Sequence, residues 1–260
     1  LEAAVLSDRY WGVQAAAAKA LGELRTEAAR DALLAGLKVR NLKARRGVVA
    51  ALGEFRGDQA VFEALMPLAR GAQSWFIEAE ANRSIGKLRA AGSFEAIVAN
   101  IDRRSFREIV RQGCIDGLVE LRDVRGLEVI GRCAAYGEPW QARAVATGAL
   151  ARLAVFHEGQ KKPTGDRLVE LLRDPDFRVR IAASTALKTL GDASFAGEVA
   201  DMASRELDGR AVRMGRENAA ALRKGASTSD EVKSLRDEFE KLRDENARLR
   251  DRVEKLEALP

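Results

Sequence analysis

The chain has 260 residues and a formal net charge of +5, and it is 47% hydrophobic but only 5% aromatic. This length allows one large domain or an extended array, and the modest basic surplus permits acidic or nucleic-acid partners without requiring them. Two cysteines exclude a disulfide framework and a cysteine metal cluster, and no run of about eighteen apolar residues predicts a membrane span. We therefore expect a cytoplasmic protein that does not enter a membrane.

The chain begins with Leu1 rather than Met, and its first six residues, LEAAVL, look like the end of a helix that started earlier. We expect the chain to be a fragment or a processed form, so that a targeting segment would not be visible.

A short apolar block recurs along the chain at separations of 31, 33, 33, 32, 37 and 33 residues. A constant period over so many copies indicates a repeat architecture. The copies are LGEL 21–24, LGEF 52–55, IGKL 85–88, LVEL 118–121, LARL 150–153, LKTL 187–190 and a degraded seventh near 220–223.

Two further apolar columns precede each block by eight and by four residues, which places all three on one face of a helix. The earlier column is Val13, Ala44, Ile77, Val110, Ala142, Val179 and Val212. Each unit also holds a preceding apolar segment, at 26–37, 58–70, 92–102, 124–135, 164–173 and 193–206. Two antiparallel helices per repeat predict an all-α fold: a right-handed α-α superhelix, a HEAT-like repeat solenoid of about seven helical hairpins over residues 1–225.

Tryptophans occupy one position of the repeat, two residues before the earlier column, at Trp11, Trp75 and Trp140, and Phe177 shares that position. Recurrence at one repeat position favours packing between neighbouring hairpins. The alternative is an aromatic patch that binds a ligand.

Arginines form two ladders in the repeats. The first Arg ladder, a candidate basic set on the concave face, directly follows the earlier column at Arg45, Arg111, Arg143, Arg180 and Arg213. The second Arg ladder lies at the ends of the second helices, at Arg25, Arg56, Arg89 and Arg122. We favour a structural role for both, in which the first bonds acidic groups of the turns, such as Asp174 or Asp208, and the second meets the negative end of the helix dipole. The functional alternative is a basic concave surface that receives peptide carboxylates or phosphates.

A small polar linker at 226–230 leads into a heptad pattern that predicts a coiled-coil helix over 231–260. Its Asn246 and three opposite-charge g–e′ pairs favour a parallel homodimer, with a helix folded back on the solenoid or a hetero-coiled coil as alternatives. The predicted dimer seam is Val232, Leu235, Phe239, Leu242, Asn246, Leu249, Val253 and Leu256.

Motifs for catalysis are not found in the chain. The single histidine, His157, excludes a two-His zinc motif, and its surroundings HEGQKKPTG predict a loop. No Gly-rich phosphate loop is present, so we assign no catalytic, cofactor-binding or metal-binding residue and no cofactor to this chain.

The units SDRYWGVQAAAAKALGEL (7–24) and DPDFRVRIAASTALKTLGD (174–192) resemble HEAT repeats. The runs ARRGVVAALGEFRGD, SWFIEAEANRSIGKLR and YGEPWQARAVATGALARLA, followed by the heptad tail, resemble the C-terminal region of prokaryotic zinc aminopeptidases of the aminopeptidase N family. That resemblance implies a non-catalytic module that shapes peptide access, with zinc in an upstream domain of the parent. No zinc ligand or catalytic acid of that family has a position in this chain.

Three functions follow in order of preference. The first is such a C-terminal module, which would associate with protein or peptide partners and with itself through 231–260. The second is a free-standing HEAT scaffold that dimerises through its coiled coil. The third is a nucleic-acid binder that uses the Arg ladders.

Overall fold

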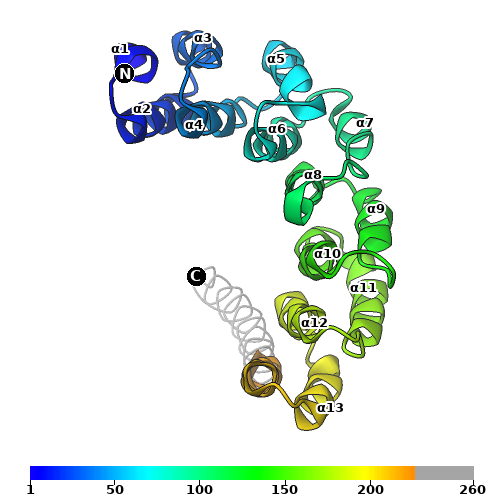
Figure 1. The fold of residues 1–260 in the computed structure, drawn as a ribbon. Coiled ribbons are helices and arrows are strands. Elements are labelled where there is room, and N and C mark those ends of the chain that lie inside the picture. Colours follow the sequence, from blue (N-terminus) through cyan, green and yellow to red (C-terminus); the bar gives the residue numbers. More distant parts are fainter. Residues whose placement is uncertain (226–260) are drawn as a thin grey trace, which may run out of the picture.

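The computed structural model describes residues 1–225, which form an arc of paired helices without a strand (Figure 1). The linker at 226–230, the coiled coil at 231–260 and the dimer seam from Val232 to Leu256 lie outside the described residues. The predicted all-α solenoid of helical hairpins is confirmed by this arrangement.

Each hairpin contributes one helix to the outer row of the arc and one to the inner row (Figure 1). The outer helices are α1 Glu2–Ser7, α3 Glu27–Gly36, α5 Gln59–Arg70, α7 Ser93–Val98, α9 Gly126–Cys133, α11 Glu158–Leu171 and α13 Ala196–Arg205. The inner helices are α2 Trp11–Leu24, α4 Leu42–Leu52, α6 Trp75–Leu88, α8 Ile109–Leu121, α10 Trp140–Ala154, α12 Phe177–Leu190 and a last helical segment that begins at 209. All inner helices run in the same direction, so their N-terminal ends share one edge of the solenoid and their C-terminal ends share the other.

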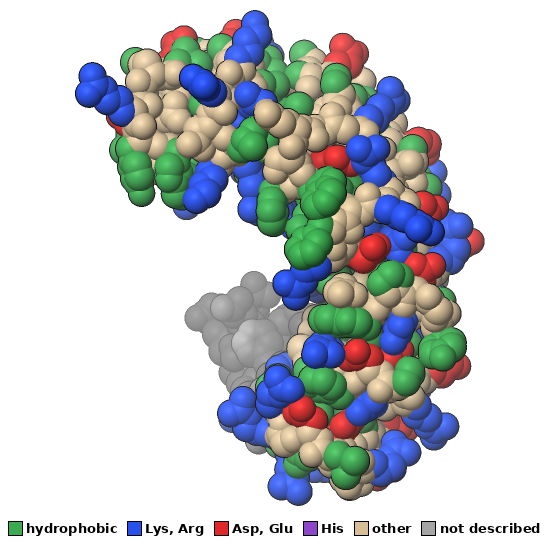
Figure 2. All heavy atoms as spheres, viewed as in Figure 1, with side chains coloured by type: hydrophobic (Ala, Val, Ile, Leu, Met, Phe, Trp, Pro, Cys, Tyr) green, Lys and Arg blue, Asp and Glu red, His purple; other side chains and the backbone are tan. Residues whose placement is uncertain are grey.

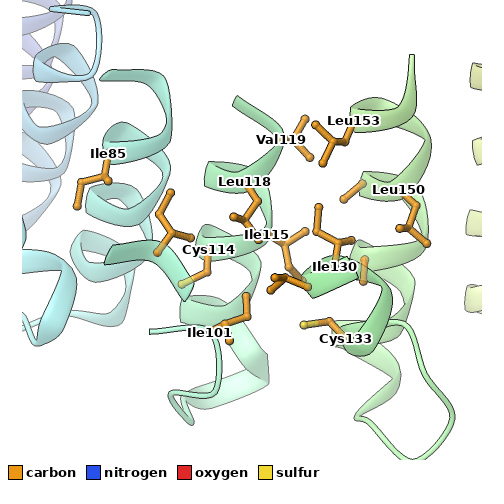
Figure 3. Close-up of a cluster of buried hydrophobic side chains, with 14 of the residues drawn as sticks. Ile85, Ile101, Cys114, Ile115, Leu118, Val119, Ile130, Cys133, Leu150 and Leu153 are labelled. Carbon is orange, nitrogen blue, oxygen red and sulfur yellow. The ribbon is translucent and has the colours of Figure 1, made fainter. Parts of the chain in front are cut away.

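One continuous hydrophobic core runs through the hairpins from Val5 to Leu222. Figure 3 shows a central part of it, where side chains of α6, α8, α9 and α10 meet. Ile85, Leu118 and Leu150 occupy equivalent places in three successive blocks and are almost fully buried. The core is therefore a chain of similar contacts between neighbouring repeats, as expected of a solenoid.

Glycines bring α6 and α8 closer together than side chains would allow. A Cβ atom on Gly113 would lie 2.4 Å from the carbonyl oxygen of Ala79, and one on Gly86 would lie 2.0 Å from that of Gly117. No other residue type fits at these two positions without a shift of the backbone. The arc turns at this contact (Figure 1), because inner helices that approach more closely than their outer partners curve the array toward the inner row.

One local prediction is wrong. Residues 158–165, expected in a loop, begin helix α11 even though Pro163 lies within it, and Thr164, Gly165 and Leu168 of this helix are buried. Along the earlier column, Val13 is 42% exposed, whereas Ile77 and Val110 are buried.

Candidate interaction surfaces

The first Arg ladder lies in the first turns of the inner helices, and its side chains reach back to the loop before their own helix. Arg45 Nε donates to the carbonyl oxygen of Val39 at 2.9 Å, and Arg111 Nε donates to that of Ile101 at 3.1 Å. Arg143 and Arg180 make the same contact with the carbonyl oxygens of Glu138 and Asp174. These bonds satisfy carbonyl groups in the loops that follow the outer helices, which have no partner within the helix.

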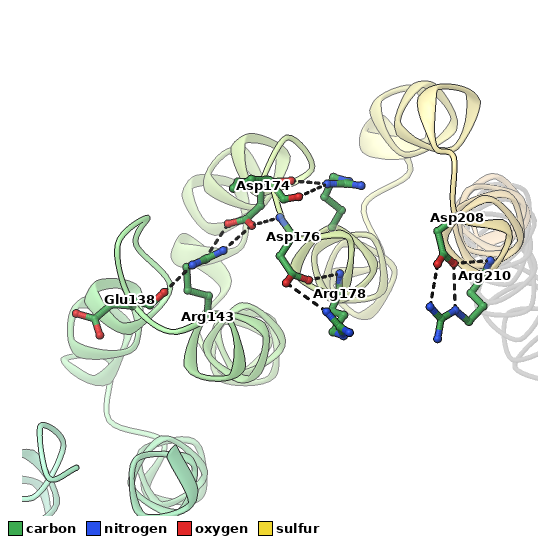
Figure 4. Close-up of polar contacts among 9 residues, drawn as sticks. Glu138, Arg143, Asp174, Asp176, Arg178, Asp208 and Arg210 are labelled. Atoms are coloured by element: carbon green, nitrogen blue, oxygen red, sulfur yellow. Dashed lines mark hydrogen bonds and ion pairs between the residues drawn. The ribbon is translucent and has the colours of Figure 1, made fainter. Parts of the chain in front are cut away.

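Three of these arginines also bind a carboxylate from the loop of the next repeat. Arg143 holds Asp174 through two bonds of 2.8 and 3.0 Å (Figure 4). Arg180 likewise binds Glu206 through two bonds, and Arg111 binds Glu138 through one. Arg111 and Arg143 are 8% and 7% exposed. The guanidinium groups are therefore engaged between repeats, where they link each loop to both of its neighbours.

Asp208 has a different partner from the one the sequence suggested. It accepts bonds from Arg210, two residues later (Figure 4), and this contact lowers the pKa of Asp208 to about 2. The remaining member of the first ladder, Arg213, is exposed and lies 3.9 Å from Glu217 of its own helix.

Sequence reasoning missed two members of this column, Gln14 and Glu78. The amide of Gln14 donates to the carbonyl oxygen of Val5 at 3.1 Å, as the arginines do in later repeats. Glu78 is fully buried and forms an ion pair with Arg103 of the next loop. In this repeat the helix therefore supplies the carboxylate and the loop supplies the arginine. Both residues directly follow members of the earlier column, Val13 and Ile77. Their place in the repeat could have identified them as members of the first ladder.

The second Arg ladder lies at the C-terminal ends of the inner helices, at the edge of the solenoid opposite the first ladder. Arg25, Arg89 and Arg122 adopt the left-handed conformation, with φ of 52°, 51° and 59°. An L-residue other than Gly, Asn or Asp rarely takes this conformation, because its Cβ crowds the backbone. Gly191 occupies the equivalent place in a later repeat with φ of 74°.

The partners of the second ladder are few. Arg25 pairs with Glu54 at 3.0 Å. Arg89 Nε donates to the carbonyl oxygen of Glu120, and the guanidinium of Arg122 lies 3.8 Å from the ring centroid of Phe156. Within residues 1–225, Arg56, Arg89 and Arg122 have no carboxylate at ion-pair distance. Burial and the neighbouring positive charges of Arg122 and Arg56 lower the pKa of Arg89.

Aromatic side chains lie at the opposite edge, at the N-terminal ends of the inner helices. Trp11, Trp75 and Phe76 are 37%, 47% and 53% exposed, and the Trp75 ring stacks on the exposed Phe106 at 6.3 Å. We call Trp11, Trp75, Phe76 and Phe106 the aromatic edge. Hydrophobic side chains gather on the hollow side of the arc over α2 and around α6 and α8 (Figure 2). The tryptophans are thus only partly covered by packing between hairpins.

Cations, mostly from neighbouring inner helices, cover several of these rings. Lys43 Nζ lies 5.0 Å from the Trp11 ring centroid, and Arg46 lies 5.7 Å from that of Phe76. Farther along the edge, Arg178 lies over both Trp140 and Phe177. Cation–π contacts at exposed sites contribute about 0.5–1 kcal/mol each, so these residues hold the rings in place and leave part of each ring surface open.

A groove of about 490 Å³ runs between α2 and α4. It is lined by the small residues Ala15, Gly47, Ala50 and Ala51 and by the charged residues Lys19, Glu23, Glu54 and Lys87. The small side chains leave room for the side chains of another molecule.

Residues 1–225 contain no group of three His, Cys, Asp or Glu side chains that could hold a metal ion. Over the same residues, none of the helices combines the length and the hydropathy needed to cross a bilayer. His157 precedes α11, and its Nε2 lies 3.1 Å from the carbonyl oxygen of Arg122. Cys114 and Cys133 are buried free thiols, and burial raises the pKa of Cys133 to about 11.

Comparison with known proteins identifies the class of the fold. Residues 1–86 match the family model described as HEAT repeats, and the hairpin pattern continues to 225. None of the curated proteins matches the chain.

Two solved structures are similar over most of the chain. The complex of CpcE and CpcF of phycocyanin lyase from Nostoc sp. PCC7120 is 18% identical, with a TM-score of 0.50, over 85% of this chain and 92% of that chain. Human deoxyhypusine hydroxylase in complex with glycerol is 12% identical, with a TM-score of 0.42, over 87% of this chain and 94% of that chain. At 18% identity the likeness to the first of these structures shows the fold alone: a helical-repeat solenoid.

Proposed function

We propose that the chain is a helical-repeat scaffold that binds a protein or peptide partner along the hollow side of its arc. The aromatic edge is the observation that carries the proposal. Trp75, Phe76 and Phe106 are each about half exposed and lie close together, and Trp and Phe are enriched where proteins bind one another. The groove between α2 and α4 supplies further apolar surface on the inner helices.

The similar solenoid from Nostoc supports an interaction role, because its structure is described as a complex of two different proteins, CpcE and CpcF. That structure supports only the use of such a fold in association with another polypeptide. The chemistry of the partner must come from the surfaces of this chain.

The test replaces the aromatic edge with serines in the variant Trp75→Ser/Phe76→Ser/Phe106→Ser. The bound proteins are identified by cross-linking and mass spectrometry in extract from the native cells. The matched control is Val124→Ser/Tyr136→Ser/Leu207→Ser, whose side chains are 44%, 82% and 101% exposed. We expect a defined partner with the wild type and the control but not with the edge variant. An identical set of cross-linked proteins for all three would refute the proposal.

Self-association is the second part of the proposal, and the heptads at 231–260 support it. Sedimentation should show a dimer for the full chain and a monomer for residues 1–228, because the truncation removes the seam. Asn246→Ile should raise stability and loosen the choice of oligomer, since an Asn at an a position of a coiled coil costs stability and restricts register. A full chain that sediments as a monomer would rule out the parallel coiled coil.

A narrower version of the proposal makes the solenoid the non-catalytic C-terminal module of a zinc aminopeptidase. It rests on the resemblance of the runs ARRGVVAALGEFRGD and YGEPWQARAVATGALARLA together with the heptad tail. The discriminating observation is the coding sequence upstream of Leu1. An H-E-x-x-H motif a few hundred residues earlier would support this version, whereas a start codon within a few residues of Leu1 would eliminate it.

A further inference from the structure

At the C-terminal edge of the inner row, three arginines in successive repeats lack an ion pair within residues 1–225. Arg56 lies four residues after the end of α4, and Arg89 and Arg122 directly follow α6 and α8. None of the three has a carboxylate at ion-pair distance within residues 1–225, whereas the fourth member, Arg25, pairs with Glu54. Like charges that repel one another without an ion pair are electrostatically costly, and an anion placed among them would relieve that cost.

Backbone conformation is a second, independent observation at the same place. Arg89 and Arg122 both have φ above 50°, in the region that favours glycine. The equivalent residue in a later repeat is Gly191, which takes the same conformation without a Cβ. Arginine is thus present where glycine would be the more stable choice. Residues held in such conformations concentrate at binding sites.

The arrangement also restricts which anion fits. Neighbouring helices pack about 8–10 Å apart, so the arginines of successive repeats form a row with about that spacing. An extended polypeptide advances about 3.3–3.6 Å per residue, so acidic side chains three residues apart match the row. Guanidinium groups bind carboxylates through paired hydrogen bonds.

We propose that Arg56, Arg89 and Arg122 form a docking edge for an extended acidic segment of a protein partner. This inference names the partner chemistry of the proposed scaffold and therefore rests on that function. The aromatic edge and this basic edge flank the inner helices on opposite sides. One partner that crosses the hollow of the arc can reach both.

The experiment measures binding of a fluorescein-labelled peptide, about nine residues long, with Glu at every third position and Gly and Ser between. Fluorescence anisotropy is followed with the full chain at low salt, because exposed charge pairs are screened as ionic strength rises. The same peptide with Gln in place of Glu is the ligand control. We expect the Glu peptide to bind, to weaken as salt increases, and to bind at least about tenfold more tightly than the Gln peptide, because exposed Arg–carboxylate pairs are individually weak but additive.

Protein variants locate the binding. Arg56→Gln/Arg89→Gln/Arg122→Gln should lose about tenfold or more in affinity for the Glu peptide. The control Arg40→Gln/Arg70→Gln/Arg173→Gln removes the same net charge from other exposed positions and should leave the affinity unchanged. Circular dichroism of both variants should retain the helical signal. Equal losses in the two variants would show non-specific attraction and overturn the proposal.

A single-stranded oligonucleotide of similar charge is the competing ligand. If it binds through the three arginines while the Glu peptide does not, the edge recognises phosphates of a nucleic acid and the acidic-segment proposal is wrong. Failure of the peptide to bind, together with capture of a partner that depends on the aromatic edge, would overturn this inference and leave the scaffold function standing.

Discussion

The two Arg ladders place the same side chain at opposite ends of the same helices. In the first ladder, Arg111 and Arg143 are buried between repeats, and each binds a carbonyl oxygen and a carboxylate. In the second, Arg56 and Arg122 are exposed and have no carboxylate at ion-pair distance within residues 1–225. The difference shows that periodicity of a charged residue does not reveal its role. The role depends on what the next repeat places beside it.

The physical reason lies in the loops on either side. At the N-terminal edge, the loops before α10 and α12 supply Glu138 and Asp174 together with unpaired carbonyl groups. At the C-terminal edge, the backbone N–H of Arg25 already satisfies the carbonyl of Leu21, and Arg89 donates only to the carbonyl oxygen of Glu120. Three arginines of the first edge are therefore bound to carboxylates, whereas Arg56, Arg89 and Arg122 at the second edge have no ion pair within residues 1–225.

The largest expected effect is at Arg143, the most completely paired member of the first ladder. Arg143→Leu leaves Asp174 buried and charged without its partner, and we expect a loss of about 3–5 kcal/mol in the free energy of unfolding. Urea denaturation followed by circular dichroism measures it. Arg213→Leu is the matched control in the same column. Its side chain is 72% exposed, so we expect a change within about 0.5 kcal/mol.

A double variant checks the origin of that loss. Arg143→Leu/Asp174→Asn removes the unpaired charge, so it should recover part of the stability, on the order of 1–2 kcal/mol. No recovery would mean that Arg143 acts through packing rather than through its ion pair.

A smaller effect is expected at Arg45, which binds only the carbonyl oxygen of Val39. Arg45→Leu breaks one charged hydrogen bond and leaves no buried carboxylate behind, so we expect a loss of about 1–2 kcal/mol, measured in the same way. A loss equal to that of Arg143→Leu would contradict the importance given to the carboxylate.

At Arg89 of the second ladder, replacement by glycine should cost little stability. Arg89→Gly relieves the left-handed backbone but loses the bond to the carbonyl of Glu120, so the free energy of unfolding should change by less than about 1 kcal/mol. Arg89→Ala loses the same bond without the relief and should be less stable than the glycine variant by about 1 kcal/mol. Equal stability of the two variants would show that the backbone at this position is unstrained.

The smallest expected effect is in the pH dependence at the N-terminal edge. Because Arg210 lowers the pKa of Asp208 to about 2 in the folded chain, its contribution to stability is present above the unfolded pKa, about 3.9. It is lost as the pH falls toward about 2. Asp208→Asn should be slightly less stable than the wild type at neutral pH and equal to it at the acid end. Denaturation curves across this pH range measure the difference in the free energy of unfolding between the variant and the wild type. A difference that persists at low pH would mean that Asp208 stabilises the backbone turn and does not act through its charge.

Much of the fold could be predicted from the sequence, because the period and the apolar columns report directly on helix pairing. The outer segments expected at 58–70 and 124–135 coincide closely with α5 and α9. The start of α11 could not be predicted, because Pro163 and the nearby Gly159 and Gly165 signal a break in isolation. Burial of Leu168 and Gly165 overrides that signal.

The sequence by itself determined the all-α repeat, its register and the two Arg ladders, since these follow from spacing along one chain. Only the tertiary structure decided which arginines are engaged and which aromatic side chains stay exposed. The carboxylate partners of Arg111, Arg143 and Arg180 lie 26 to 31 residues farther along the chain. Contacts over such separations depend on how the loops of successive repeats meet. The sequence shows that Trp75 and Phe106 are aromatic. Their exposure and their stacking depend on how the folded repeats meet at this edge.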